Sequence, residues 1–407
     1  MPSGPRRSRR RRHPRAIAVA AAGAVALIAA GGFGTPSLRP LGVGLILLGV
    51  GAIALVELVA RGMRISRSVS HDALRSGEPA VATIRLTGRP VRNRLLGILD
   101  WDIRPSLPAA ARVESRRPSW AGAEIRGEFR FSGLPRGEHR LGPPGVAIAD
   151  PFGLARVRRA VTTNDTVLVL PRTVPIAVPF WESGAARRAG HHAGQLRGRA
   201  ELGGIRDYEP GDPLSLIHWA QTARRGRLQT KEIHGESGRG TTLLVLLDAR
   251  ADPGNGGPPD GPFEVAVSAA ASLVAACAAR GDAVGLEHTA AGPAGLAIGT
   301  RAEAIERELA VVQADGAQAI SLALRAAVGR GQTVRTLVLV SASGDRGLAA
   351  AADHARAAGV SLAVVLVGPA RAYGQDLRRA GAWVAEVAGA SDLAAALDGG
   401  GVRAQRV

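Results

Sequence analysis

The run Leu243-Leu244-Val245-Leu246-Leu247-Asp248 decides the fold of the second half of this chain of 407 residues. An unbroken aliphatic run indicates a strand that is buried on both faces, because a strand with one solvated face alternates apolar and polar residues. Further strands are expected at 334–340 and 360–367, with helical stretches between them. This alternation predicts a doubly wound, parallel α/β domain over residues 240–398. Residues 399–407 are expected to form a frayed tail.

Asp248 stands at the end of the first of these strands, and ligands of doubly wound sheets bind at the carboxyl ends of strands. The run Ser341-Ala342-Ser343-Gly344-Asp345 follows another strand. An aspartate with nearby hydroxyls and a second acid is a donor set for a hard divalent cation. The loop after Asp248 lacks serine, however, and contains Arg250. The pattern therefore favours an aspartate that caps its own loop over a metal site.

The stretch 203–235, upstream of this domain, holds many chemically distinct side chains within a short span. Its Pro210-Gly211-Asp212-Pro213 run predicts a turn that leads into a helix, with Asp212 as the N-cap and Pro213 at the first helical position. The helix is expected to stop at Gly226, and a strand is expected at 228–233.

We interpret this stretch first as a clasp between domains, with its charges paired and Tyr208 and Trp219 packed between the domains. It is also a candidate docking surface, because residues 185–231 carry nine basic and four acidic side chains and would attract an acidic protein surface or a phosphate. Lys231 is the only lysine of the chain and is the first place to look for a role beyond the clasp. The residues assigned to this partner-binding or interdomain motif are Gly204, Arg206, Asp207, Tyr208, Pro210, Gly211, Asp212, Pro213, His218, Trp219, Arg224, Lys231 and Glu232.

A catalytic alternative uses Asp207, Asp212 and His218 as an acid/base set of a hydrolase-like enzyme. No nucleophile elbow and no glycine-rich phosphate loop accompanies them in the sequence. The single cysteine, Cys277, lies in an apolar helical run. We therefore expect neither a catalytic residue nor a cofactor, and the hydrolase remains the alternative.

Residues 66–171 are predicted to form a small β-sandwich, because short alternating strands are separated by glycine and proline turns. The run 124–131 has apolar residues or glycine at its odd positions and charged residues at its even positions. Residues 172–202 are predicted to be a linker rich in arginine, glycine and alanine. The neighbouring His191 and His192 have no acidic or cysteine partner at metal-ligand spacing.

Two apolar runs near the N-terminus predict a transmembrane hairpin over residues 16–61. The first run, 16–33, has 18 uncharged residues and would span ~27 Å as a helix, close to the roughly 30 Å of a hydrocarbon core. A second run at 41–56 argues against a cleaved signal peptide, and neither run has the polar face of a soluble core helix. A small-residue stripe, which would let the helices approach closely, is expected at Ala18, Ala22, Ala26 and Ala30.

The placement of arginine predicts the orientation in the cell membrane. The tail 1–15 carries seven arginines and no acid, Arg61, Arg64 and Arg67 follow the second run, and only Arg39 lies in the connection. Both termini and the soluble domains are thus expected in the cytoplasm. The net charge of +18 fits contact with the lipid bilayer. Nucleic acid is disfavoured as a partner, because few aromatic residues interleave the basic ones.

With these residues in hand, the chain resembles the bacterial family called domain of unknown function 58. The resemblance rests on 204–213, on Ile217-His218-Trp219, on the segment 223–228 and on Lys231-Glu232, with the upstream Asp150-Pro151-Phe152-Gly153-Leu154. It implies two membrane helices, a β-domain, the motif and a von Willebrand factor A-like α/β domain.

The resemblance also implies a partner, because such proteins are typically encoded beside MoxR-type AAA+ ATPases. It further implies a magnesium site of the Asp-x-Ser-x-Ser type, from which Asp248-x-Arg250-x-Asp252 departs. We therefore expect a membrane-anchored, non-enzymatic adaptor or scaffold that binds a MoxR-type ATPase. A cell-envelope assembly component is a further alternative.

Overall fold

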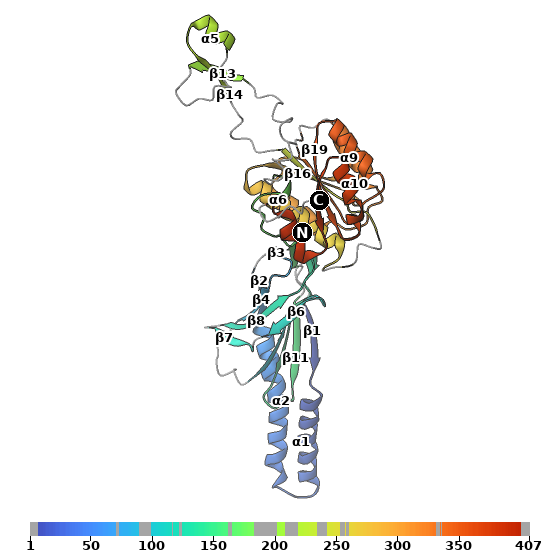
Figure 1. The fold of residues 1–407 in the computed structure, drawn as a ribbon. Coiled ribbons are helices and arrows are strands. Elements are labelled where there is room, and N and C mark those ends of the chain that lie inside the picture. The colour runs from blue at the N-terminus through green and yellow to red at the C-terminus, as the bar shows by residue number, and fades with distance from the viewer. Residues whose placement is uncertain are drawn as a thin grey trace. The chain divides into compact units, whose positions relative to one another are not determined.

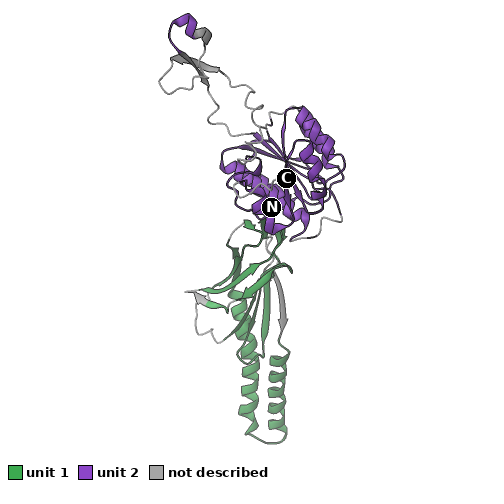
Figure 2. Cartoon of the chain, in the orientation of Figure 1, with its two compact units in different colours: residues 1–170 green, residues 171–407 purple. Residues whose placement is uncertain are grey.

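The chain divides into two compact units, Met1–Leu170 and Pro171–Val407, in a computed structural model (Figure 2). The described residues are 7–70, 73–88, 99–115, 117–121, 124–161, 165–182, 202–207, 219–233, 242–252, 257, 260–330, 334 and 336–399.

A pair of antiparallel helices stands near the start of the first unit (Figure 1). They are α1 (Pro14–Gly32) and α2 (Leu38–Gly62), and both are long and apolar enough to cross a membrane. Gly34 takes the left-handed backbone conformation, with φ of 63°, in the connection between them. The prediction of two apolar helices at the N-terminus is confirmed. The helix α6 (Pro262–Ala279) of the second unit also has this length and composition, but it is mostly buried in a protein core.

Glycines and small alanines bring α1 and α2 into backbone contact. A Cβ at Gly49 would lie 2.5 Å from the carbonyl oxygen of Ala16, and a Cβ at Gly23 would lie 2.6 Å from that of Gly42. The expected stripe of alanines is wrong in part, because Ala18 and Ala22 are exposed. Ala16 and Gly23 of α1 make the contact instead, because these residues face α2 where the two helices meet.

The rest of the first unit is built of short strands in three sheets, so the strands expected here are present. The largest sheet has the order β2-β4-β8-β6, with β7 also paired to β8; the others are β1-β11-β10-β5 and β3-β12-β9. The strands are β1 (Arg7–Arg12), β2 (Arg64–Val69), β3 (Ala73–Arg75), β4 (Ala80–Thr87), β5 (Asp100–Arg104), β6 (Arg112–Ser115), β7 (Ser119–Ala121), β8 (Glu124–Ser132), β9 (Gly137–Arg140), β10 (Gly145–Ala149), β11 (Arg156–Val161) and β12 (Thr166–Leu170).

Alternating side chains from these sheets fill one core. Ile125, Phe129 and Phe131 of β8 are buried together with Ile148 of β10 and Val157 of β11. In β8 the buried residues are the odd-numbered ones, as the sequence alternation predicts.

A buried arginine ties the sheets together. The Arg67 side chain is 0% exposed, and its Nη2 lies 2.6 Å from Oδ2 of Asp165. Its Nη1 donates to the carbonyl oxygens of Pro105 and Gly142, at 3.1 and 2.6 Å. A buried charge is tolerated only when it is paired and hydrogen-bonded in this way.

Two contacts join β11 and the loop before it to the helix ends. The Ala16 amide, in the first turn of α1, donates to the Leu154 carbonyl oxygen at 3.1 Å. The Arg159 side chain of β11 donates to the carbonyl oxygens of Ala60 and Met63, which belong to the last turn of α2 and its C-cap. The β-region is therefore fixed to the helix ends, where the first amides and the last carbonyl oxygens have no partner within the helix.

A six-stranded sheet forms the centre of the second unit, in the order β17-β16-β15-β18-β19-β20. All neighbouring strands are parallel except the edge strand β17, which is antiparallel to β16. The strands are β15 (Thr242–Leu247), β16 (Ala283–His288), β17 (Gly295–Leu296), β18 (Thr336–Ser341), β19 (Ser361–Val367) and β20 (Trp383–Val387).

Helices cover both faces of this sheet (Figure 1). Leu243, Val245 and Leu247 pack with α6, α7 (Ala302–Val311) and α11 (Leu393–Leu397) on one face. Leu244 and Leu246 pack on the other face with the remaining helices, which are α8 (Ile320–Gly329), α9 (Leu348–Ala357) and α10 (Gly374–Arg379). Burial on both faces is the physical reason for the unbroken aliphatic run from which the α/β sheet was predicted.

Residues 171–182 pack on this α/β core, although the sequence pattern assigns 172–202 to a linker. Phe180 and Trp181 are buried in the core, with their rings edge to face at 5.0 Å. The Val174 amide donates to Ser272 Oγ at 3.0 Å, and Arg280 Nη1 lies 2.8 Å from Glu182 Oε2. Two aromatic side chains in a segment otherwise rich in small residues are the signal for this docking.

Candidate functional site

The motif that the sequence singles out is described only in part. Strands β13 (Leu202–Asp207) and β14 (Gln229–Ile233) pair antiparallel, with Gly204 opposite Glu232 and Arg206 opposite Thr230. The ladder thus brings the two ends of the motif together, because residues on either side of the intervening segment become neighbours.

Helix α5 (Trp219–Arg225) lies between these two strands in sequence. Gly226 ends it with φ of 68° and donates its amide to the Thr222 carbonyl oxygen, as the sequence predicts for a glycine stop. Arg224 is exposed on this helix. The predicted residues that lie outside the described part of the chain are Tyr208, Pro210, Gly211, Asp212, Pro213 and His218.

The catalytic alternative and the clasp therefore both stay predictions. Asp207 ends β13, whereas Asp212 and His218 are outside the described residues. The pairing of Ile205 with Lys231 places the only lysine inside the β13–β14 ladder.

The carboxyl edge of the α/β sheet carries a polar cluster around Asp248. Strands β15 and β18 lie side by side there, although α6, β16, β17, α7 and α8 separate them in sequence. This is the switch point at which doubly wound sheets bind ligands. Asp248 is 1% exposed, and its Oδ2 accepts hydrogen bonds from Ser341 Oγ at 2.6 Å and Ser343 Oγ at 2.8 Å.

Arg250 completes this cluster. Its amide donates to Asp248 Oδ1 at 3.2 Å, and its Nη2 donates to the Gly344 carbonyl oxygen at 2.6 Å. The Asp345 carboxylate accepts the amides of Ser321 and Gly347, at 2.9 and 2.7 Å. The two carboxylates and the guanidinium thus hold together the loops that follow β15 and β18 and the first turn of α8.

The donor set at Asp248 does not fit a divalent cation. Mg²⁺ needs near-octahedral coordination by oxygen atoms, with one or two carboxylates and several waters among them, whereas here the Arg250 guanidinium reaches the Gly344 carbonyl oxygen next to the two serines. Within the described ranges, no three His, Cys, Asp or Glu side chains group at metal-binding distance. The geometry matches an aspartate that caps and cross-links loops.

Cys277 is not placed for nucleophilic chemistry. It is 1% exposed in α6. Burial raises the pKa of the Cys277 thiol to about 12, and the nearby charge of Arg280 offsets this only in part. The thiol therefore stays protonated at neutral pH, and the thiolate is the nucleophilic form.

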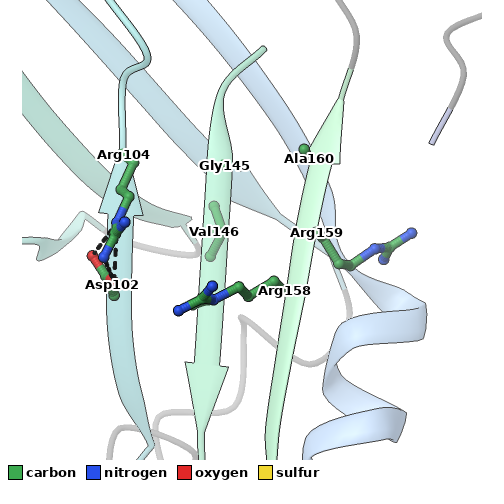
Figure 3. Close-up of a pocket in the computed structure, with 8 residues that line it drawn as sticks. Asp102, Arg104, Gly145, Val146, Arg158, Arg159 and Ala160 are labelled. Carbon is green, nitrogen blue, oxygen red and sulfur yellow. Dashed lines mark hydrogen bonds and ion pairs between the residues drawn. The ribbon is translucent and has the colours of Figure 1, made fainter. Parts of the chain in front are cut away.

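An open pocket of about 230 Å³ lies on the β5-β10-β11 face of the first unit, and sequence reasoning missed it (Figure 3). Asp102, Ala147 and Arg158 stand opposite one another on the three strands. Directly opposed residues point to the same face of a sheet. Small residues on β10 form the floor, so Arg158 extends across this strand towards Asp102 and Arg104 (Figure 3).

The charge of this pocket is mainly positive. Arg104 forms hydrogen bonds to Asp102, the shortest at 2.9 Å, and Arg156 lies 3.8 Å from the same carboxylate. The hydrogen bond to Asp102 and its negative charge raise the pKa of Arg104, so the guanidinium stays ionised. Arg158 is exposed and forms no ion pair with any residue that the structure describes. Two guanidinium groups thus contact Asp102, and a third is not paired with it. This excess of positive charge suits a carboxylate- or phosphate-bearing surface.

A signal for the pocket exists in the sequence but is weak. In Arg156-Val157-Arg158, arginine alternates with a buried valine, and Asp102 and Arg104 flank Ile103 in the same way. Alternation predicts that each pair shares a strand face. It does not say that β5 and β11 flank the same small-residue strand, because that depends on strand order.

Comparison with known proteins supports the expected family. Residues 204–340 match the family described as "Protein of unknown function DUF58". The "Uncharacterized protein YeaD" of Bacillus subtilis (strain 168) is 25% identical over 251 residues, which cover 58% of this chain and 58% of that protein. The chain thus matches a little over half of that relative's length. The resemblance to domain of unknown function 58 is supported by both findings.

The similarity of this chain to solved structures is low. The Deinococcus radiodurans RO (RSR) protein matches with 19% identity and a TM-score of 0.27, covering 40% of this chain and 35% of that chain. A variant of BcpA, the major pilin subunit of Bacillus cereus, matches with 9% identity and a TM-score of 0.17, covering 28% of this chain and 44% of that chain.

Proposed function

We propose that this protein is a membrane-anchored adaptor whose cytoplasmic units bind an acidic surface of a protein partner. The proposed partner is a MoxR-type AAA+ ATPase, as the family resemblance implies. The α/β domain is proposed to be von Willebrand factor A-like and to serve binding. Its doubly wound sheet and the aspartate at the end of its first strand support this assignment.

The observation that carries the proposal is the arginine-lined pocket. An exposed guanidinium that forms no ion pair with the described residues can form a charge-assisted hydrogen bond when a carboxylate arrives. Arg158 is such a group, and Arg104 and Arg156 lie on the same sheet face. Positive patches of this kind steer association with acidic partners.

The helix pair supports the anchor. The two helices meet through glycine contacts, which are typical of helix packing in lipid. Large apolar side chains point away from that contact, such as Ile28, Leu47 and Leu58, which are 75, 67 and 69% exposed. Side chains of this kind are favourable in a hydrocarbon core and costly in water.

The proposed topology predicts the behaviour of reporter fusions. Alkaline phosphatase fused after residue 70 is expected to stay inactive, because Arg61 and Arg64 keep that side of α2 in the cytoplasm. The same enzyme inserted at Ser37, between the helices, is expected to be active. The activities of the two fusions are compared at equal expression level. The reverse pattern of activity would refute the topology.

Substitution at the pocket is expected to release the partner. Arg158→Glu should weaken copurification of the full chain with a MoxR-type ATPase by roughly tenfold or more, because a carboxylate would then face the partner's acids. Pull-down from detergent extracts of cells that express both proteins measures this. The retained fraction should also fall as salt rises.

Arg130→Glu is the matched control, because Arg130 is an exposed arginine on β8 of the same unit. It should leave the retained ATPase unchanged. Arg206→Ala and Asp212→Ala test whether the motif contributes as well, with circular dichroism to show that the variants fold. Equal retention by Arg158→Glu and the unaltered protein would contradict the proposed docking surface.

A further inference from the structure

The turn between β10 and β11 carries an exposed aromatic side chain. Phe152 lies at the tip of this turn and is 71% exposed. Outside α1 and α2, no other large apolar side chain in the part of the chain that the structure describes is as exposed. A single exposed apolar residue is common on protein surfaces. What Phe152 does therefore depends on where the turn lies and on what holds it there.

Asp150 holds this turn in shape. Asp150 is 3% exposed, its Oδ2 accepts the Phe152 amide at 2.9 Å, and its Oδ1 accepts the Ala155 amide. Its carbonyl oxygen accepts the Gly153 amide at 3.0 Å, and Gly153 takes the left-handed conformation with φ of 68°. Because these bonds involve the backbone and the buried aspartate, the exposed Phe152 ring contributes little to the stability of the turn.

The turn is attached to the start of α1. The Leu154 carbonyl oxygen accepts the Ala16 amide at 3.1 Å, and a Cβ at Gly153 would lie 4.0 Å from Nη1 of Arg15. Figure 1 shows β11 beginning beside this end of α1. Ala16 is also the first residue of the apolar run that we propose to cross the membrane. The turn therefore lies at the level at which α1 would enter the lipid.

Charged and apolar surface meet at this level of α1. The Arg15 side chain is exposed, and Ile17, which is 60% exposed, begins the apolar outer surface of the helix. A guanidinium group suits the phosphate layer of a leaflet, and an apolar ring suits the boundary between the headgroups and the acyl chains. Arg15 and Phe152 offer one group for each layer.

We propose that the 150–154 turn is a second lipid contact of the first unit. The Phe152 ring enters the headgroup–acyl boundary of the leaflet that α1 crosses, and Arg15 binds lipid phosphate beside it. Because the Ala16–Leu154 hydrogen bond joins the turn to α1, the contact sets the tilt of the β-sheets against the membrane. A protein surface is the competing occupant, and continuity with the apolar outer surface of α1 favours lipid. This inference rests on the proposed membrane anchor.

A fluorophore at residue 151 tests the contact. Pro151 is exposed in the same turn, so Pro151→Cys places a thiol beside Phe152 and leaves the ring in place. Cys277, the only natural cysteine, is 1% exposed and should take no label. The labelled full chain is placed in phosphatidylcholine nanodiscs, whose two faces are both open to solvent. We expect strong quenching by a lipid with a nitroxide near its glycerol and weak quenching by aqueous iodide.

Removal of the ring should reverse this pattern. Phe152→Ser in the labelled Pro151→Cys chain should lower the ratio of lipid quenching to iodide quenching by roughly tenfold, the effect of losing the burial of one aromatic side chain. The turn itself should persist, because the bonds of Asp150 do not involve the ring. An unchanged ratio would show that Phe152 does not hold the turn at the membrane.

Val113→Cys is the matched control in the same unit. Val113 is 45% exposed and lies opposite Phe131, about 20 Å along β8 from Ile125. Ile125 pairs with Leu86 at the end of the sheet that adjoins the start of β2, directly after α2. A label at residue 113 should therefore be quenched by iodide and not by the lipid nitroxide.

A label at Leu47 separates failure of this inference from failure of the anchor. Leu47 is 67% exposed on α2, so the label on Leu47→Cys should be quenched by a nitroxide deep in the acyl chain. Absence of that quenching refutes the anchor and this contact with it. Quenching at Leu47, with a Pro151 label as open to iodide as the Val113 label, refutes this contact alone. Shielding of the Pro151 label only after a protein partner is added would assign the ring to that partner instead.

Discussion

Asp248→Ala is expected to lower the free energy of unfolding of the α/β domain by about 3 kcal/mol or more. The variant leaves the buried Ser341 Oγ and the partly buried Ser343 Oγ and Arg250 amide without their acceptor. Each buried donor left unsatisfied costs about 1–3 kcal/mol. Denaturant unfolding of the full chain, followed by circular dichroism, measures the loss.

Asp353→Ala is the matched control, because the Asp353 side chain is 55% exposed and pairs only at the surface with Arg356. Its effect should stay within about 0.5 kcal/mol. A similarly small effect of Asp248→Ala would show that the cluster does not hold the loops. Added Mg²⁺ should not raise the unfolding midpoint of the unaltered protein. If Mg²⁺ raises the midpoint and Asp248→Ala removes this increase, the carboxyl edge of the α/β sheet binds the cation.

Gly49→Leu is expected to destabilise the helix pair by about 2 kcal/mol, the usual cost of overpacking a close contact. The new side chain would meet the Ala16 carbonyl oxygen at 2.5 Å and the Ala20 Cβ at 3.1 Å. Because these are backbone and alanine atoms, no flexible group can move aside. The helices must separate or shift, and the β-sheets attached to their ends lose support. Thermal unfolding in detergent, followed by circular dichroism, measures the change.

Gly51→Leu is its control on the same helix, since a Cβ at Gly51 has no heavy atom within 4 Å. Both variants add the same apolar side chain two positions apart, so helix propensity and hydrophobicity are matched. Gly51→Leu should unfold like the unaltered protein. If both variants unfold alike, the glycine contact does not stabilise the pair.

Much of the fold follows from hydrophobic periodicity. The two apolar runs predict α1 and α2, the odd-numbered residues of β8 are buried as their alternation requires, and the aliphatic run of β15 forms a strand covered on both faces. In each case the prediction rests on residues close together in sequence, because the period at which side chains become buried is set by the local backbone geometry.

The candidate sites were predictable only in part. The sequence places Asp248 at a strand end and the serines of 341–343 at another, but it does not show that the two ends meet. It favours Ala18 and Ala22 for the helix contact, whereas Gly23 and Gly49 make it. Several rows of small residues run along α1, and only the partner helix selects one of them.

The sequence by itself determined which segments are helices and strands and which of their faces are apolar, because these properties depend on residues close together in the chain. Only the tertiary structure decided that β15 lies beside β18, that Arg158 extends towards Asp102 across β10, and that Glu57 of α2 meets His13 at the N-cap of α1. Such contacts join residues far apart in sequence. They depend on strand order and helix packing, which are set by the fit of whole surfaces and leave no periodic trace in the sequence.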